Sequence, residues 1–365
     1  MSSSKTENVE KVAEPLHFGI ISTANIGKQF VAGFQASPYC VAAAVGSRGL
    51  ERAVEWAREQ GVERAYGSYE EVLQDARVGA VYVPLPTSMH AEWAVKGAKA
   101  GKHVLCEKPL AATFEEAVVM ARACDEARVA LMDGVMWSHH LKYVAIKRDG
   151  HFASLGKVTH CNAHFSWPQL DPANIRLAPS LEPTGCLGDL GWYTIRACLF
   201  AFNGELPVSV SAGGQKCPVS GAVVETHALL NYAGGRFATM GCSFATVENQ
   251  SFEVHGTLGT LCCQDFVWAH SRPDAGNFQI FRGEGRVESH HVAPGPEPFR
   301  TLELVNRFAS SALKGDTLRQ WTLLALKTQA IHDAVLRSSL SDSAPVLLSD
   351  YVSQYPDIAL PIDII

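Results

Sequence analysis

The sequence contains no long apolar run, because glycine or charged residues interrupt each stretch well before the ~20 residues that cross a bilayer. Residues 1–15, MSSSKTENVEKVAEP, also lack the apolar core of a secretory signal, so we expect a flexible tail and a cytoplasmic protein. Basic tracts are missing as well: 31 Lys and Arg residues stand against 37 Asp and Glu, a formal net charge of −6. This balance argues against nucleic acid or an anionic membrane as the main partner.

Signatures of metal binding and of hydrolases are absent too. The ten cysteines form no CxxC pair, and the adjacent histidines His139–His140 and His290–His291 would point apart on a strand. No G-x-S-x-G motif occurs. We therefore expect no metal. We interpret the cysteines, which lie mostly in apolar strand-like runs, as buried reduced thiols.

The first feature that is present is a regular alternation of strand and helix patterns. Helical spacing of apolar residues and two capping boxes, Ser68–Glu71 and Thr113–Glu116, predict helices. Short apolar runs between them predict strands at 16–21, 40–46, 79–86, 102–106 and 129–134. Such alternation is typical of a parallel sheet that binds ligands at the carboxyl ends of its strands. We expect residues 16–137 to form this α/β domain.

The pattern changes after about residue 150. Glycine, proline and short alternating runs predict a hairpin at 227–244 and two strands around a glycine turn at 251–263. Helical patterns follow near 300–313 and 320–338. Because 365 residues are enough for two domains, we expect residues 138–365 to form a second one, with a large, mostly antiparallel sheet.

The turn after the first strand resembles a phosphate-binding loop. The dinucleotide fingerprint has glycine at three positions, which are here Ser22, Ala24 and Gly27. Small residues still permit close backbone approach, and the N–H groups at the start of the next helix can bind a pyrophosphate. We expect the cofactor contacts to come from Ser22, Thr23, Ala24, Asn25 and Ile26. An ordinary strand–turn–helix is an equally good interpretation of this segment alone.

The residues at the end of the second strand distinguish an NAD site from an NADP site. NAD sites usually carry Asp or Glu there, whereas this chain has Ser47 and Arg48, with Arg52 one turn further on. A guanidinium suits a 2′-phosphate, so the sequence predicts NADP rather than NAD. The alternative is that Arg48 is a solvated surface charge.

Two further segments carry candidate catalytic residues. Lys108 follows a strand and precedes Pro109, which directs it toward the cofactor edge of the sheet, although it could instead pair with Glu107. If a helix begins near Gly188, Asp189 and Tyr193 share one face, where they could bind a hydroxylated substrate and move a proton. The pattern alone favours the plainer interpretation, a helix-capping Asp and a packed Tyr.

Six motifs together resemble the Gfo/Idh/MocA oxidoreductases, nearest the dihydrodiol dehydrogenase and D-xylose dehydrogenase branch. They span residues 18–261 and read FGIISTANIG, VGSR, YVPLPTSMHAEWAVKGAKAGKHVLCEKPL, MDGVMW, GCLGDLGWY and VHGTLGTL. The resemblance implies a Rossmann domain followed by an α/β domain with an open, mostly antiparallel sheet. It also implies a homodimer, because members often associate through that sheet.

The resemblance further implies roles for matching positions. Lys108 would lie near the nicotinamide and substrate, Asp189 in the substrate pocket, and Tyr193 would donate or accept a proton. The remaining matches are Glu107, Pro84, Thr87 and His90 on the cofactor side and, more loosely, Trp137, His139 and Arg176 in the substrate pocket.

The expected function is NADP-dependent hydride transfer to or from a hydroxyl carbon of a sugar or cyclic diol. Free tyrosine has a pKa of about 10, and a cation 4 Å away would lower it by about three units at an effective dielectric of 20. Lys108, helped by the positive charge of the nicotinamide and opposed by desolvation, is therefore expected to lower the pKa of Tyr193 toward neutrality. The alternative is a regulatory protein that senses the dinucleotide without catalysis; the presence of Lys108, Asp189 and Tyr193 favours an enzyme.

Overall fold

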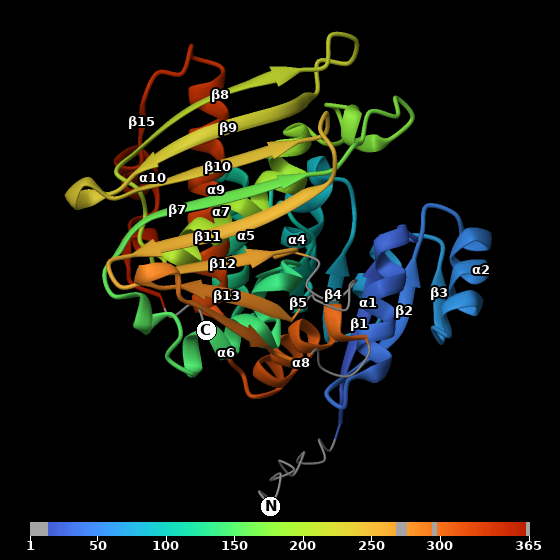
Figure 1. Ribbon diagram of the computed structural model, residues 1–365. Coiled ribbons are helices and arrows are strands. Elements are labelled where there is room, and N and C mark those ends of the chain that lie inside the picture. The colour runs from blue at the N-terminus through green and yellow to red at the C-terminus, as the bar shows by residue number, and fades with distance from the viewer. Residues whose placement is uncertain (1–13, 268–275, 294–297, 363–365) are drawn as a thin grey trace, which may run out of the picture.

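The computed structural model describes residues 14–267, 276–293 and 298–362 and contains two sheets (Figure 1). The first sheet has six strands, all parallel, in the order β3-β2-β1-β4-β5-β6. Its strands are β1 (Leu16–Ile21), β2 (Cys40–Gly46), β3 (Arg64–Tyr66), β4 (Ala80–Val83), β5 (His103–Cys106) and β6 (Leu131–Asp133). This confirms the predicted Rossmann sheet. The three-residue strand β3 was not predicted, because it has no apolar run.

The helices of this domain alternate with its strands, as the sequence predicts. They are α1 (Asn25–Ala36), α2 (Leu50–Gln60), α3 (Tyr69–Gln74), α4 (His90–Lys99) and α5 (Phe114–Ala127). Both predicted capping residues cap their helices: Ser68 Oγ accepts a hydrogen bond from Glu71 N, and Thr113 Oγ1 accepts one from Glu116 N. Only residues 14 and 15 of the expected tail lie within the described residues.

A helix near the C-terminus, α8 (Phe299–Leu313), packs against the first domain. Phe18, Phe30, Phe34 and Tyr82 stack in the core beneath α1, and Phe308 of α8 reaches Phe18 at 5.6 Å between ring centroids. A Cβ at Gly33 of α1 would lie 2.5 Å from Thr301 Oγ1, so the absence of a side chain there lets α8 approach closely. The C-terminal part of the chain therefore supplies part of the layer that covers the Rossmann sheet.

The second sheet has nine strands in the order β14-β13-β12-β11-β7-β10-β9-β8-β15. Every pairing is antiparallel except β7 with β10. The strands are β7 (Val158–Ser166), β8 (Ser209–Lys216), β9 (Val223–Asn231), β10 (Phe237–Ser243), β11 (Asn249–Gly256), β12 (Thr260–Gln264), β13 (Asn277–Phe281), β14 (Val287–His291) and β15 (Val346–Leu347). Both predicted strand pairs, β9–β10 and β11–β12, are confirmed.

Helices cover one face of this sheet (Figure 1). α7 (Trp192–Ala201) packs on β7 and β10, and α9 (Arg319–Ser339) packs on β8 and also on β6 and α5 of the first domain. The smaller helices are α6 (Leu141–Arg148) and α10 (Ser349–Gln354). No helix within the described residues is long and apolar enough to cross a membrane.

A buried ion pair joins the two domains. Arg196 Nη2 of α7 lies 2.5 Å from Asp133 Oδ2 at the end of β6, and both side chains are only 1% exposed. Trp192 Nε1 donates to the same carboxylate oxygen, and Arg196 Nε donates to Thr328 Oγ1 of α9. These contacts fix the start of α7 against the carboxyl edge of the Rossmann sheet.

Candidate active site

Lys108 is held at the end of β5 by the buried carboxylate of the preceding residue. Glu107 Oε1 accepts a hydrogen bond from the Tyr82 hydroxyl at 2.8 Å, and Oε2 accepts one from Lys108 N at 3.1 Å. Burial raises the pKa of Glu107. The Lys108 side chain does not turn back to this carboxylate but extends toward the second domain.

Asp189 lies on a π-helical turn, Leu187–Gly191, that leads directly into α7. Such turns occur frequently at functional sites. A Cβ at Gly188 would lie 2.2 Å from Thr184 Oγ1 and 3.1 Å from Pro109 Cγ. Because Gly188 has no side chain, the turn packs against Pro109, and Asp189 comes within reach of Lys108.

The three predicted catalytic residues converge, and Arg176 joins them. Lys108 Nζ lies 2.5 Å from Asp189 Oδ1 and also donates to the Asp189 carbonyl oxygen at 3.1 Å. Arg176 Nε donates to Asp189 Oδ2 at 2.7 Å. The Lys108 Nζ lies 5.3 Å from the centroid of the Tyr193 ring. The Asp189 carboxylate is therefore bound between two cations.

The charges of Lys108 and Arg176 act on the pKa of Asp189, and the charge of Asp189 acts on the pKa of Lys108. Burial tends to raise the pKa of Asp189, but Lys108 and Arg176 outweigh it and bring the pKa to about 2. Burial lowers the pKa of Lys108, but Asp189 and then Tyr193 outweigh it, so this pKa lies above its ordinary value. At neutral pH the cluster therefore holds a carboxylate and an ammonium.

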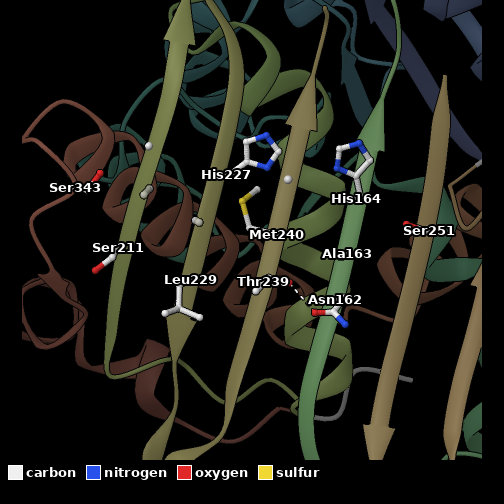
Figure 2. Close-up of a pocket in the computed structure, with 14 residues that line it drawn as sticks. Asn162, Ala163, His164, Ser211, His227, Leu229, Thr239, Met240, Ser251 and Ser343 are labelled. Carbon is white, nitrogen blue, oxygen red and sulfur yellow. Dashed lines mark hydrogen bonds between the residues drawn. The ribbon is translucent and has the colours of Figure 1, made fainter. Parts of the chain in front are cut away.

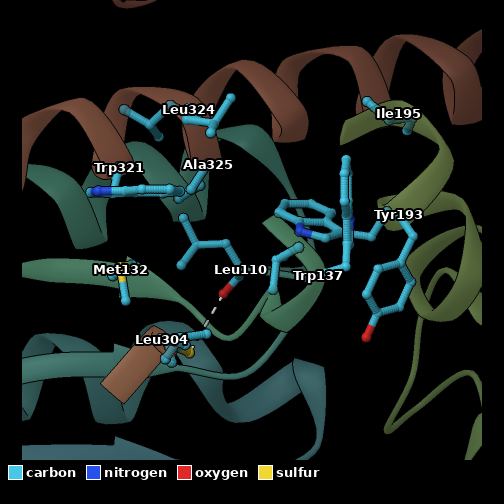
Figure 3. Close-up of a cluster of buried hydrophobic side chains, with 14 of the residues drawn as sticks. Leu110, Met132, Trp137, Tyr193, Ile195, Leu304, Trp321, Leu324 and Ala325 are labelled. Carbon is cyan, nitrogen blue, oxygen red and sulfur yellow. Dashed lines mark hydrogen bonds between the residues drawn. The ribbon is translucent and has the colours of Figure 1, made fainter. Parts of the chain in front are cut away.

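The expected lowering of the pKa of Tyr193 is not observed. Burial raises it to about 12, and the opposing effect of Lys108 is reduced by the carboxylates of Glu107 and Asp189. Lys108 alone therefore does not bring this pKa toward neutrality, because burial opposes it most strongly and Asp189 neutralises part of its charge. Figure 3 shows the Tyr193 hydroxyl pointing away from α9, which carries Trp321 and Leu324. In this form of the protein, Tyr193 keeps its proton at neutral pH and is suited to donate it.

Two residues expected in the substrate pocket lie in the hydrophobic core instead. Trp137 is 1% exposed and packs edge-on against Tyr143 at 4.6 Å, and His139 is 3% exposed and stacks on Trp321 at 4.2 Å. Of the three residues expected in the pocket, Arg176 is the one that contacts the Lys108–Asp189 pair.

The residues expected beside the nicotinamide are buried, and their side chains contact other residues of the protein. His90 is buried, with Nδ1 2.9 Å from the Pro109 carbonyl oxygen and Nε2 2.8 Å from that of Leu85. Thr87 is buried and donates to Glu182, and Pro84 is buried at the end of β4. These contacts tie together the loops that follow β4 and β5.

The predicted phosphate turn has the geometry that a dinucleotide requires. Ser22 has φ +143°, a value that favours glycine, so the backbone keeps the shape of the fingerprint although the residue differs. The start of α1 has no side-chain cap and no acidic residue in its first turn. Gly27 N donates to the Ala24 carbonyl oxygen at 3.0 Å, but no described side chain caps the N–H groups before it, so Ser22, Thr23, Ala24, Asn25 and Ile26 fit a pyrophosphate.

The end of β2 fits a second phosphate. Ser47 is buried, whereas Arg48 and Arg52 are exposed and form no ion pair with any residue that the structure describes. Two unpaired guanidinium groups at this position suit the 2′-phosphate of NADP. Among the described residues, no group of three metal-ligating side chains occurs.

Sequence reasoning missed Glu182. Its carboxylate accepts hydrogen bonds from Thr87 N at 3.2 Å and from Thr87 Oγ1 at 2.5 Å. Glu182 belongs to no motif, and its partner lies 95 positions away, so no local pattern could have indicated this contact.

Comparison with known proteins agrees with this fold. A model described as the oxidoreductase family with an NAD-binding Rossmann fold matches residues 16–135, and a model described as the GFO/IDH/MocA C-terminal domain matches residues 153–262. The D-xylose 1-dehydrogenase (NADP(+)) 2 of Haloferax volcanii is 32% identical over 90% of this chain and 98% of its own. The trans-1,2-dihydrobenzene-1,2-diol dehydrogenase of Danio rerio is 29% identical over 93% of this chain and 95% of its own.

Solved structures share the same architecture. A 3-ketoreductase from Actinomadura kijaniata, in complex with NADP and TDP-benzene, has a TM-score of 0.80 and 27% identity over 89% of this chain and 98% of its own. Levoglucosan dehydrogenase, in complex with NADH and levoglucosan, shares the fold with a TM-score of 0.82 at 20% identity, over 92% of this chain and 100% of its own. The chain thus belongs to the Gfo/Idh/MocA oxidoreductase family, as its motifs implied, and is an NAD(P)-dependent oxidoreductase that acts on CH–OH groups.

Proposed function

We propose that this protein transfers hydride between NADP and a hydroxyl carbon of a sugar or cyclic diol. The observation that carries the proposal is the convergence of Lys108, Asp189 and Tyr193 at the carboxyl edge of the Rossmann sheet. The named activities of the xylose and dihydrodiol dehydrogenases support the substrate class.

Each member of the cluster has a chemical role in this proposal. Bound NADP supplies the hydride chemistry, and residues 22–26 with Arg48 and Arg52 hold it. Tyr193, which keeps its proton at neutral pH, donates it to a carbonyl oxygen in reduction and is then reprotonated from solvent. In oxidation it first loses its proton to solvent and then accepts the proton of the substrate hydroxyl. Lys108 stabilises negative charge on that oxygen.

Asp189 and Arg176 are proposed to recognise the substrate. They lie within hydrogen-bond distance of each other beside Lys108, at the partly exposed end of the cluster. A carboxylate accepts and a guanidinium donates hydrogen bonds, so together they can bind neighbouring hydroxyl groups. That pairing suits a vicinal diol or a sugar ring.

The turnover test uses a panel of possible substrates. The protein is mixed with NADP⁺ and aldoses, deoxy-sugars, inositols and trans-dihydrodiols, and the absorbance of the reduced nicotinamide is followed. We expect turnover of at least one sugar or diol. Firm NADPH binding without turnover across the panel would contradict the proposal and would fit a dinucleotide sensor instead.

The preference for NADP has its own test. Replacing Arg48 with alanine removes a cation proposed to bind the 2′-phosphate, so NADPH should bind more weakly while NADH binding stays unchanged. Nicotinamide fluorescence measures both affinities. An unchanged NADPH affinity would contradict the assignment of Arg48.

We also propose a cytoplasmic homodimer formed through the open face of the nine-stranded sheet. Figure 2 shows part of that face, a hollow of about 460 Å³ flanked by His164 and His227 and bordered by Leu229, which is 39% exposed. All ten cysteines are free thiols, which supports a reducing compartment. Sedimentation should give a dimer mass that Leu229→Arg reduces to a monomer; a monomeric wild type would contradict the dimer.

A further inference from the structure

Glu182 lies where the second domain meets the start of α4. Its segment connects the short 3₁₀ turn Ile175–Leu177 to the π turn that carries Asp189. The two oxygens of its carboxylate accept from Thr87 N and Thr87 Oγ1, and Ser88 N donates to the Leu181 carbonyl oxygen at 3.1 Å. Three hydrogen bonds thus join residues 181–182 to residues 87–88.

This contact provides a helix cap from another domain. The 3₁₀ turn Thr87–Met89 and the helix α4 that follows it have no side-chain cap of their own. The first N–H groups of a helix lack partners, and a negative charge at that end is favourable. Thr87 is only 1% exposed, so its N–H and hydroxyl need partners within the protein, and Glu182 supplies both.

The same contact is part of a closed series of contacts, here called the circuit, that surrounds the Lys108–Asp189 ion pair. From Thr87 the chain runs to His90, whose Nδ1 faces the Pro109 carbonyl oxygen, one residue beyond Lys108. Lys108 binds Asp189, and Asp189 binds Arg176, six residues before Glu182 on the same segment. The charge of Glu182 also acts on Arg176, whose pKa it helps to raise, although Asp189 contributes most.

We infer that Glu182 is a positioning residue for the proposed reaction: by holding Thr87, it fixes the loop after β4 and thereby the spacing of Lys108 from Asp189 and Arg176. This inference rests on the proposed function for its effect on turnover. Its effect on the position of Lys108 does not depend on any substrate.

The test compares Glu182→Gln and Thr87→Val with the wild type. Glutamine keeps the shape of the side chain but loses the charge and one of the two acceptor oxygens. Small misplacements of reacting groups are costly, so we expect kcat to fall about tenfold or more while the affinity for NADPH changes by less than about twofold. The double variant should lose little more than either single variant, because both remove the same contact.

Glu205→Gln is the matched control. Glu205 is also a partly exposed loop glutamate with a cationic partner, Arg236 at 2.6 Å, but it belongs to neither the cluster nor the circuit. This variant should retain wild-type kcat, NADPH affinity and Lys108 reactivity.

A second measurement needs neither cofactor nor substrate. The rate at which acetic anhydride acylates Lys108, followed by mass spectrometry of the ligand-free protein, reports how firmly Nζ is held by Asp189. We expect acylation to become severalfold faster in Glu182→Gln and in Thr87→Val, but not in Glu205→Gln.

Two results would overturn the inference. One is an unchanged kcat in Glu182→Gln. The other is an unchanged rate of Lys108 acylation in that variant. A lower melting temperature with an unchanged acylation rate would mean that Glu182 serves only the stability of the protein. If the wild type turns over no substrate, the proposed function fails, and the acylation rate alone then decides the positioning role.

Discussion

Replacing Lys108 with methionine tests the electrostatic role of this residue. Its Nζ lies 5.3 Å from the centroid of the Tyr193 ring, where a unit charge at an effective dielectric of 20 contributes about 3 kcal/mol. That energy corresponds to a little over two pKa units, and the carboxylate of Asp189 offsets part of it. Without the ammonium, negative charge on Tyr193 or on the substrate oxygen becomes harder to form. We expect kcat to fall by ~10²-fold.

Steady-state rates from nicotinamide absorbance measure this loss, and fluorescence titration with NADPH measures cofactor binding, which should largely remain. Lys96→Met is the matched control, because Lys96 lies on the surface of α4, where it pairs with Glu92 at 2.7 Å and Glu70 at 3.2 Å. The control should keep wild-type turnover. Near-normal turnover in Lys108→Met would refute the reasoning.

Three further predictions concern other buried groups. Tyr193→Phe should lower kcat by ~10²-fold with NADPH binding retained, and a wild-type rate would remove the tyrosine from the mechanism. Asp133→Asn leaves the Arg196 guanidinium buried without its counter-ion, so urea denaturation should show a loss of about 3–5 kcal/mol; a loss below about 1 kcal/mol would contradict this. Burial lowers the pKa of Lys327 from 10.5 to about 8, so the unfolded chain binds more protons between these values and stability should rise with pH across that window. Relative to Lys327→Met, the wild type should gain about 3 kcal/mol in free energy of unfolding from pH 8 to 10.5, and equal pH dependence in both proteins would disprove the shift.

The elements of the Rossmann domain were predictable because their signals are local. The strand Leu16–Ile21 is a short apolar run, and the side chains of Ser68 and Thr113 cap α3 and α5, which begin at the next residue. Strand β3 (Arg64–Tyr66) has no such signal, and it is fixed by pairing with β2. The return of α8 to α1 likewise depends on long-range packing, which a helical pattern does not specify.

The candidate site was predicted less completely, for the same reason. The local pattern favoured Asp189 as a helix cap, whereas its carboxylate binds Lys108, 81 positions away, and only the resemblance to a family pointed there. The pKa of Tyr193 depends first on its burial and then on how far Asp189 neutralises Lys108, and spacing along the chain reveals neither. His139 was expected in the pocket, but its stacking on Trp321 is a tertiary contact without a sequence signal.

The most direct test of the central claim is a crystal structure with NADP⁺ and a turned-over sugar or diol bound. We predict that the reacting carbon lies within about 3.5 Å of nicotinamide C4, with its oxygen within hydrogen-bond reach of both the Tyr193 hydroxyl and the Lys108 ammonium. A nicotinamide ring bound away from these two side chains, or a substrate oxygen that contacts neither, would contradict the claim.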